Sequence, residues 1–232
     1  MKKFGVVVFI FALVAGLILA NMFSFGRFRE KFFNISFNSG VSGSGNIVTD
    51  RREVSDFRGL DVGGIFKVEA TAQKDFGVEV QVDDNLLPMV KTEVRGGILH
   101  IELDGHISSR GPILVRVSAP DFNSVEASGA SSISISGLKN AEISVNSSGA
   151  SKINLSGETA KLNVDVSGAS NINASDLKAV DAHVEASGAS HVDVFSTGKL
   201  YSDASGASRI TYSGSPASVD RKTSGASSVS GK

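Results

Sequence analysis

The chain has 232 residues, a net charge of −1 and neither cysteine nor tryptophan. Its composition excludes a disulfide scaffold, cysteine-ligated zinc, iron–sulfur clusters, thiol catalysis and a lipid-modified cysteine. Residues 1–36 carry five basic side chains and one acidic side chain, which leaves a net charge of −5 for the remainder. A mildly acidic body lacks the basic stripe that nucleic-acid binding requires, so we expect no nucleic-acid partner.

Residues 1–25 are predicted to form a hydrophobic helix that serves as a transmembrane anchor or a signal peptide. In Phe4–Phe25 only Asn21 and Ser24 are polar, and this length suffices to cross a hydrocarbon core. Two preceding lysines favour a cytoplasmic N-terminus with the rest of the chain outside. Cleavage after Ala20 fits equally well. Both alternatives predict an extracytoplasmic location in the cell envelope, whether membrane-anchored, periplasmic or at the cell surface.

Residues 26–46 are expected to connect this segment to the folded body. The stretch 25–37 is basic and aromatic, which fits a juxtamembrane spacer or a segment lying on a membrane surface. A Gly/Ser linker follows at 38–46. The body is predicted to begin with irregular β coils or a β cap over residues 47–123, interrupted by one short helical turn at 86–90. Regular repeats occupy 124–232, and one continuous β domain is favoured over two.

A repeated tetrapeptide determines the predicted fold. Ser-Gly-Ala-Ser occurs six times, at intervals of 18 to 20 residues. On both sides of it, Ile, Val and other apolar residues alternate with polar residues at the same places in each repeat. Such alternation is typical of β-strands, and such a period is typical of a solenoid. We therefore predict an all-β, single-stranded parallel β-helix with coils of about 19 residues, preceded by the hydrophobic helix.

The tetrapeptides are expected to form tight corners between strands. Stacked coils lie about 4.8 Å apart, so larger side chains would collide at a corner, and glycine can also adopt positive φ there. The predicted structural corners are Gly129, Gly149, Gly168, Gly188, Gly206 and Gly225. The serines are expected to bond along the stack or to backbone groups that the corners leave unpaired.

One outward column of polar side chains is the candidate binding face. It lies two places before the tetrapeptide and consists of Glu126, Asn146, Asp165, Glu185 and Asp203. Neighbouring carboxylates in this column could serve glycosidic hydrolysis, which uses a convergent pair about 5–10 Å apart. However, Asn146 and Lys222 share the column, and no sugar-stacking aromatic side chain is expected beside it. These features favour a solvated ladder over a catalytic pair.

No catalytic residue, cofactor or metal site is predicted. The four histidines (His100, His106, His183 and His191) lack a metal-ligand spacing. The stretch Asp83–Asn85 lacks the further oxygen ligands of a calcium loop and is expected to form a turn. The tetrapeptide serines occur in six copies, whereas a nucleophile is one special site.

Several stretches together resemble the head GIN domain family of putative auto-transporter adhesins. They are Gly43-Ser44-Gly45-Asn46, Arg52 with Val54, Ser55 and Phe57, Leu60-Asp61-Val62, Asp83 with Asn85-Leu86-Leu87, Gly97–Ile101 and the tetrapeptide array. The resemblance covers about residues 43–230. It implies a right-handed parallel β-helix in bacterial envelope proteins, without catalytic residues.

The predicted function is that of a non-enzymatic, exported β-solenoid that presents polar ladders to an envelope glycan or protein. The alternatives are a carbohydrate-active enzyme of the lyase or hydrolase type and a membrane-anchored envelope sensor. The membrane is a further expected partner, through Phe4–Phe25 if this segment stays uncleaved. Because the sixth repeat stops at Lys232 with a strand edge, end-to-end association of copies is also expected.

Overall fold

The computed structural model describes residues 40–109 and 111–232, so the predicted N-terminal helix and the segment up to residue 39 lie outside the described residues. Residues Gly40–Lys232 form one compact unit built from β-strands and, among the described residues, one 3-10 helix, η1 (Leu87–Met89). This helix is the predicted helical turn. No helix in 40–109 or 111–232 has the length and apolar character needed to cross a membrane.

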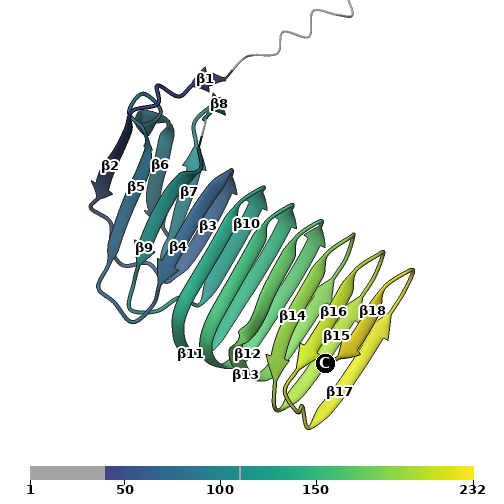
Figure 1. Cartoon of the computed structure of the whole chain (residues 1–232). Coiled ribbons are helices and arrows are strands. Elements are labelled where there is room, and N and C mark those ends of the chain that lie inside the picture. The colour runs from purple at the N-terminus through teal and green to yellow at the C-terminus, as the bar shows by residue number, and fades with distance from the viewer. Residues whose placement is uncertain (1–39, 110) are drawn as a thin grey trace, which may run out of the picture. The chain divides into compact units, whose positions relative to one another are not determined.

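The repeats form two faces of stacked parallel strands (Figure 1). The first, called the ladder face, comprises β10 (Ser124–Gly129), residues 144–149, 163–168 and 182–186, β15 (Lys199–Ala204) and β17 (Ser218–Thr223). The opposite face comprises residues 132–136, 152–156 and 171–174, β14 (His191–Ser196), β16 (Arg209–Ser213) and β18 (Ser228–Gly231). The parallel solenoid is therefore confirmed, whereas its right-handed sense stays a prediction.

Three long strands contribute to both faces. They are β11 (Ser132–Gly149), β12 (Lys152–Gly168) and β13 (Asn171–Ala186). The first part of β11 pairs with one neighbouring strand and its last part with another, so the strand bends around the side of the coil. Because each coil is hydrogen-bonded to the next along most of its length, the sheet is continuous from coil to coil.

The predicted apolar columns line the core between the two faces. On the opposite face, one column is fully buried and consists of Ile133, Ile153, Ile172, Val192 and Ile210. Its counterpart on the ladder face consists of Val125, Val145, Val164 and Val184. Burying each side chain contributes about 1.5–3 kcal/mol. A coil is covered only by its neighbours, so the stack is stable as a set rather than coil by coil.

The tetrapeptides form the corners that lead from the ladder face to the opposite face. All six predicted glycines have positive φ, between +72° and +137°. A Cβ added at Gly149 would lie 2.5 Å from the carbonyl oxygen of Gly129 in the preceding coil. The following alanine donates its N–H to that oxygen, at 2.8 Å from Ala150 N. Close stacking of backbone on backbone therefore requires glycine here.

The last serine of each tetrapeptide satisfies buried polar groups at the corner. Ser170 is 2% exposed, and its hydroxyl donates to Gly149 O at 3.3 Å. Ser170 Oγ in turn accepts hydrogen bonds from Ser147 Oγ at 2.9 Å and from Ser151 N at 3.1 Å. These bonds confirm the expected role of the serines, because an unpaired buried N–H would be costly.

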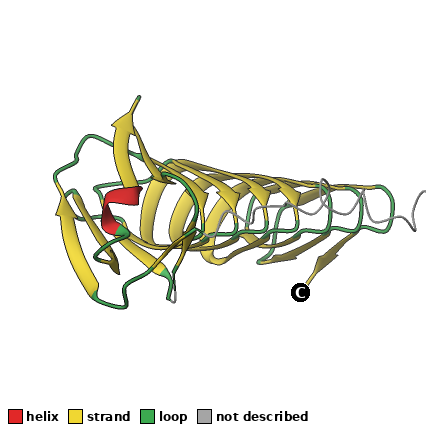
Figure 2. Ribbon diagram, turned by 90° about the horizontal axis from the view of Figure 1, so that it is seen from above, coloured by secondary structure: helices red, strands yellow, loops and turns green. Residues whose placement is uncertain are grey.

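Residues 47–123 combine coils of parallel strands with antiparallel strands. The parallel strands are β3 (Gly59–Gly64), β4 (Phe66–Thr71), β7 (Ile98–Leu103) and β9 (Ile113–Ser118). The antiparallel strands are β2 (Ile47–Arg52), β5 (Gly77–Asp83) and β6 (Val90–Arg95). The short strands β1 (Val41–Ser42) and β8 (Ile107–Ser108) pair with each other. Figure 2 shows η1 at this irregular end, away from the C-terminus.

The order of these coils in space differs from their order in the sequence. The coil of β3 and β4 pairs directly with β10 and β11. The coil of β7 and β9, which comes later in the chain, stacks on the other side of β3 and β4. After β9, the chain therefore returns past an earlier coil to begin the regular array. This return brings four connections together beside the first coils.

Candidate functional site

The predicted polar ladder lies in register along the ladder face. Glu126 is paired with Asn146, and the pairing continues through Asp165, Glu185 and Asp203. Consecutive members are therefore one coil apart, about 4.8 Å. Their side chains alternate with buried residues on the same strands and are exposed or half-buried. The ladder thus exists as a geometric feature, and its binding role stays a prediction.

The ladder extends beyond the residues that the sequence predicted. Asp61 on β3 pairs with Glu126, and His100 on β7 pairs with Asp61. At the other end, Lys222 pairs with Asp203. Sequence reasoning missed Asp61 and His100 because they have no adjacent tetrapeptide. The sequence does contain one signal for Asp61. The apolar–acidic–apolar run Leu60-Asp61-Val62 matches the pattern around Glu126.

The ladder begins at a cluster that could hold a metal ion. The candidate ligand atoms of Asp61, His100 and Glu102 lie within 4.8 Å of one another, and His100 Nδ1 is 2.9 Å from Asp61 Oδ2. A cation would compete with Arg95, whose Nη2 lies 3.5 Å from Glu102 Oε1. The spacing of the histidines in the chain does not indicate this cluster. The pairing of β3 with β7 joins residues that are remote in the sequence.

Two aromatic rings lie beside the ladder and stack on each other. The rings of His183 and Tyr201 stack with centroids 4.5 Å apart and an interplanar angle of 5°. From the next coil, Lys222 Nζ lies 5.2 Å from the Tyr201 centroid, and its hydrogen bond to Tyr201 raises the pKa of Lys222. His183 and Lys222 belong to coils on either side of Tyr201. Both faces of the Tyr201 ring are therefore covered, and neither is free to stack on a sugar.

The ladder carboxylates line one wall and do not face each other across a cleft. A shallow hollow of about 430 Å³ lies over Asp61, Glu126, Asn146 and Asp165, beside the outward serines. Glycosidic hydrolysis needs two carboxylates that flank the bond to be cleaved. Carboxylates that follow one another along a single column suit contact with an extended partner better than they suit this chemistry.

The acidic stretch Asp83–Asn85 forms the predicted turn, with Leu86 N donating to Asp83 O at 2.9 Å. Its side chains hold the stretch 43–46: Gly45 N donates to Asp83 Oδ1 at 2.6 Å, and Asn46 Nδ2 donates to Asp84 Oδ2 at 2.9 Å. Hydrogen bonds from Ser44 and Asn46 lower the pKa of Asp84. These carboxylates are engaged with protein donors, so the two sequence motifs stabilise each other.

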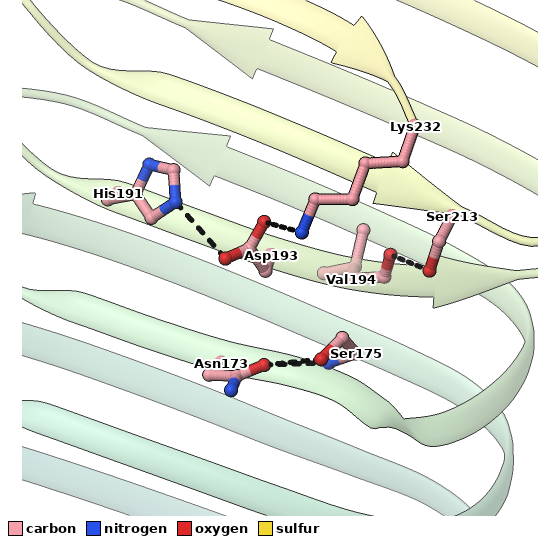
Figure 3. A network of polar contacts seen from close by, with 7 residues as sticks. All are labelled: Asn173, Ser175, His191, Asp193, Val194, Ser213 and Lys232. Atoms are coloured by element: carbon pink, nitrogen blue, oxygen red, sulfur yellow. Dashed lines mark hydrogen bonds and ion pairs between the residues drawn. The ribbon is translucent and has the colours of Figure 1, made fainter.

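A polar network on the opposite face connects two coils at the C-terminal end (Figure 3). Asp193 accepts from His191 Nε2 at 3.1 Å and from Lys232 Nζ at 3.0 Å. Burial raises the pKa of Asp193, but the contacts with Lys232 and His191 together outweigh burial. The net result is that the pKa of Asp193 is lowered. Beside this network, Asn173 Oδ1 accepts a bond of 2.7 Å from Ser175. Lys232 follows β18, whereas Asp193 lies on β14, so their contact connects two different coils. We therefore assign these contacts a structural role.

Comparison with known proteins gives a family and a set of similar folds. The family described as "Putative auto-transporter adhesin, head GIN domain" matches residues 56–216. A putative adhesin from Bacteroides fragilis is similar, with a TM-score of 0.70 and 18% identity, over 83% of this chain and 100% of that chain. A putative adhesin from Parabacteroides distasonis reaches a TM-score of 0.57 and 20% identity, over 84% of this chain and 100% of its own.

A third solved structure is described as a putative lipid binding protein from Parabacteroides distasonis. It has a TM-score of 0.52 and 21% identity, over 84% of this chain and 100% of its own. At such identities these likenesses show the shared fold alone. None of the curated proteins matches the chain.

Proposed function

Because this chain belongs to the putative auto-transporter adhesin family with a head GIN domain, we propose that it is a non-enzymatic binding module of the bacterial cell envelope. In this proposal the ladder face contacts a glycan or protein partner outside the cytoplasm. The observation that carries the proposal is the in-register column from Asp61 to Asp203, which spans every coil between them. A rigid row of evenly spaced polar groups suits a partner that is itself extended.

A glycan is the better match of the two partner classes. Carboxylate and amide oxygens of the ladder accept hydrogen bonds, and the serines beside it both donate and accept. Sugar hydroxyl groups complement this mixture. An acidic protein partner would be repelled by the unbroken run Asp165, Glu185 and Asp203. The outward serines lie beside the carboxylates in the same shallow hollow.

The proposed location follows from the family and from the hydrophobic N-terminal sequence. Adhesins act outside the cell, which supports an extracellular or surface position. In the proposal, Phe4–Phe25 serves either as a retained membrane anchor or as a cleaved export signal. Mass spectrometry of the native N-terminus separates the two: an intact Met1 supports the anchor, and a new N-terminus near Asn21 supports cleavage.

The binding role is tested by neutralising the ladder without changing its shape. The double variant Asp165→Asn/Glu185→Gln removes two adjacent charges from exposed positions, so the fold is retained. We expect its binding to immobilised envelope glycans to fall at least about tenfold, a loss of about 1.4 kcal/mol. The control Glu158→Gln/Asp176→Asn changes two exposed carboxylates outside the ladder and should bind as the unchanged protein does. Equal binding by both variants, or no binding by the unchanged protein to glycans, would contradict the proposal.

A further inference from the structure

A large groove lies beside the first coils, apart from the ladder. It consists of a hollow of about 1130 Å³ and a second of about 820 Å³, and both are lined by Phe76 and Pro120. We call this combined feature the Phe76 groove. Its lining comes from the connections β2–β3, β4–β5, β6–β7 and β9–β10, which the return of the chain brings together. Connections held by a rigid scaffold are where binding residues concentrate.

The walls of the groove are fixed by hydrogen bonds between these connections. Gln73 N donates to Pro120 O at 3.2 Å, and Arg58 N donates to Gly97 O at 2.9 Å. On the array side, Asn140 Nδ2 donates to Phe122 O at 2.7 Å. The four connections therefore hold one another, and the groove is formed before any ligand arrives. A pre-formed site loses little conformational entropy on binding.

An exposed aromatic ring stands in the middle of the groove. Phe76 is 36% exposed, whereas Phe57 beneath it is fully buried. Its ring contacts Phe57 with centroids 5.1 Å apart and an interplanar angle of 56°. The buried ring holds Phe76 in place and leaves part of it facing solvent. Because Phe76 lines both hollows, any ligand that occupies the groove meets this ring.

Unfavourable local features concentrate in the same groove. Among the described residues, the non-glycine residues with positive φ are Asp56 and Gln73, each at 62°. They line the two hollows on either side of Phe76. In addition, Asn140 Oδ1 is buried at the groove without a hydrogen-bond partner among the described residues. Backbone strain and unpaired polar atoms persist where surrounding structure enforces them, and they cluster at ligand sites.

The charges of the groove favour a neutral ligand that carries hydroxyl groups. One hollow is lined by three acidic side chains and one basic side chain, Asp56, Asp121, Glu142 and Arg58. The other is lined by three basic and two acidic side chains, Arg51, Arg52, Lys74, Glu53 and Asp75. The hydrogen bonds from Lys161 and Asn163 to Glu142 lower the pKa of this carboxyl group. Because each hollow carries both signs of charge, a polyanion or a polycation would meet repulsion in either one. A sugar ring offers an apolar face to Phe76 and hydroxyl groups to both kinds of charged side chain.

We propose that the Phe76 groove is a binding site for a neutral saccharide, with one sugar ring stacked on Phe76 and its hydroxyl groups bound by Asp56 and neighbouring polar side chains. This inference rests on the proposed glycan-binding function, and it adds to the ladder a separate saccharide site on the connections next to the first coils. The ladder and the Phe76 groove are therefore two surfaces whose roles can be distinguished by mutation.

The test uses the full chain in a mild detergent, because residues 4–25 are almost entirely apolar. Biotinylated cellohexaose, mannohexaose and chitohexaose serve as neutral probes, and hexagalacturonate serves as the anionic probe. Binding is measured by biolayer interferometry for the unchanged protein, Phe76→Ala, Asp56→Asn and Phe195→Ala. Asparagine tolerates positive φ, so Asp56→Asn removes the charge while keeping the backbone. Phe195→Ala is the matched control, because this half-buried aromatic residue lies on β14 of the opposite face and lines neither hollow.

We expect at least one neutral hexasaccharide to bind in preference to hexagalacturonate. Phe76→Ala and Asp56→Asn should each weaken that binding at least tenfold, whereas Phe195→Ala should leave it unchanged. Thermal melts followed by circular dichroism check that each variant is folded. If Phe76→Ala is unfolded, the binding of Asp56→Asn tests the inference instead. Binding of none of the neutral probes, or binding that survives the groove substitutions, overturns the inference. If only the ladder variant Asp165→Asn/Glu185→Gln loses binding, the inference fails while the proposed function stands.

Discussion

The irregular coils of residues 47–123 and the regular array of 124–232 bury their apolar side chains in different ways. The first region fills its core with large rings, including Phe57, Phe66 and Phe122, and covers its end with antiparallel strands. The array uses columns of Ile and Val with serine at the corners. In the regular array, each residue position is fixed by the equivalent position in the neighbouring coil, and the surface is even. In the irregular region, the connections between strands leave room for the Phe76 groove.

The last coils show what happens when the repeating columns end. The inward ladder-face column, apolar in earlier coils, continues with Ser202 and Arg221. Ser202 is fully buried, and its hydroxyl donates to Asp220 O at 3.2 Å. The Arg221 guanidinium carbon lies 5.7 Å from the centroid of the Tyr212 ring. The core therefore becomes more polar toward this end, where a long amphipathic side chain covers a ring.

The largest effect is expected from removing a ring of the irregular core. Phe122→Ala should lower the free energy of unfolding by about 3–5 kcal/mol, because Phe122 is fully buried and lies near Phe57, with centroids 6.5 Å apart. The matched change in the array, Val164→Ala, should cost about 1–3 kcal/mol. Urea unfolding followed by circular dichroism measures both. Equal losses of unfolding free energy in the two variants would show that the two cores do not differ in how they bury apolar side chains.

The next effect comes from a corner of the array. Gly149→Ala should cost about 2–4 kcal/mol, because its Cβ would contact backbone atoms of Gly129 and because φ is +137°. Gly96→Ala in the irregular region is the matched control: its φ is +61°, but nothing lies within 4 Å of the added Cβ. We expect about 1 kcal/mol for this control. A similar loss of stability in both variants would mean that the corners require glycine for its positive φ alone and not for the close stacking of coils.

The smallest effect concerns the network around Asp193. Because the folded pKa of Asp193 is lowered from its ordinary value of 3.8, its stabilising contribution is present above that value and is lost as the pH falls through the folded pKa. Asp193→Asn should therefore cost less than about 1 kcal/mol at neutral pH. Hydrogen exchange should quicken in β16 and β18 but not in β3 or β4. Unchanged exchange at the C-terminal end would argue against a structural role for Lys232.

The array was predictable because one short motif specifies it. The tetrapeptide aligns every column, so the buried Ile and Val positions, the corner glycines and the Glu126–Asp203 ladder follow from counting along the sequence. Asp61 and His100 were not predicted, because their place depends on coils that stack out of sequence order. No local pattern encodes that return of the chain. The stack of His183 on Tyr201 was missed for a related reason, since the two residues are neighbours only through pairing of coils.

The groove was beyond prediction on similar grounds. Phe76 reads in the sequence as one of a few isolated aromatic residues, and nothing near it marks exposure. Its position depends on Phe57 beneath it and on Pro120 from a distant connection. The strain at Asp56 and Gln73 is equally invisible, because it arises from the way the connections are held together and not from the identity of either residue.

The central claim, that the ladder face and the separate Phe76 groove bind a glycan, is tested most directly by a hydrogen-exchange footprint. The full chain is compared with and without the neutral hexasaccharide or envelope glycan that binds it best. The account predicts slower exchange in residues 163–168 and 182–186 of the ladder face and in 54–59 and 73–77 around the groove. Residues 152–156 and 171–174 of the opposite face should be unchanged. Protection confined to the opposite face, or no protection at saturating ligand, would contradict the account.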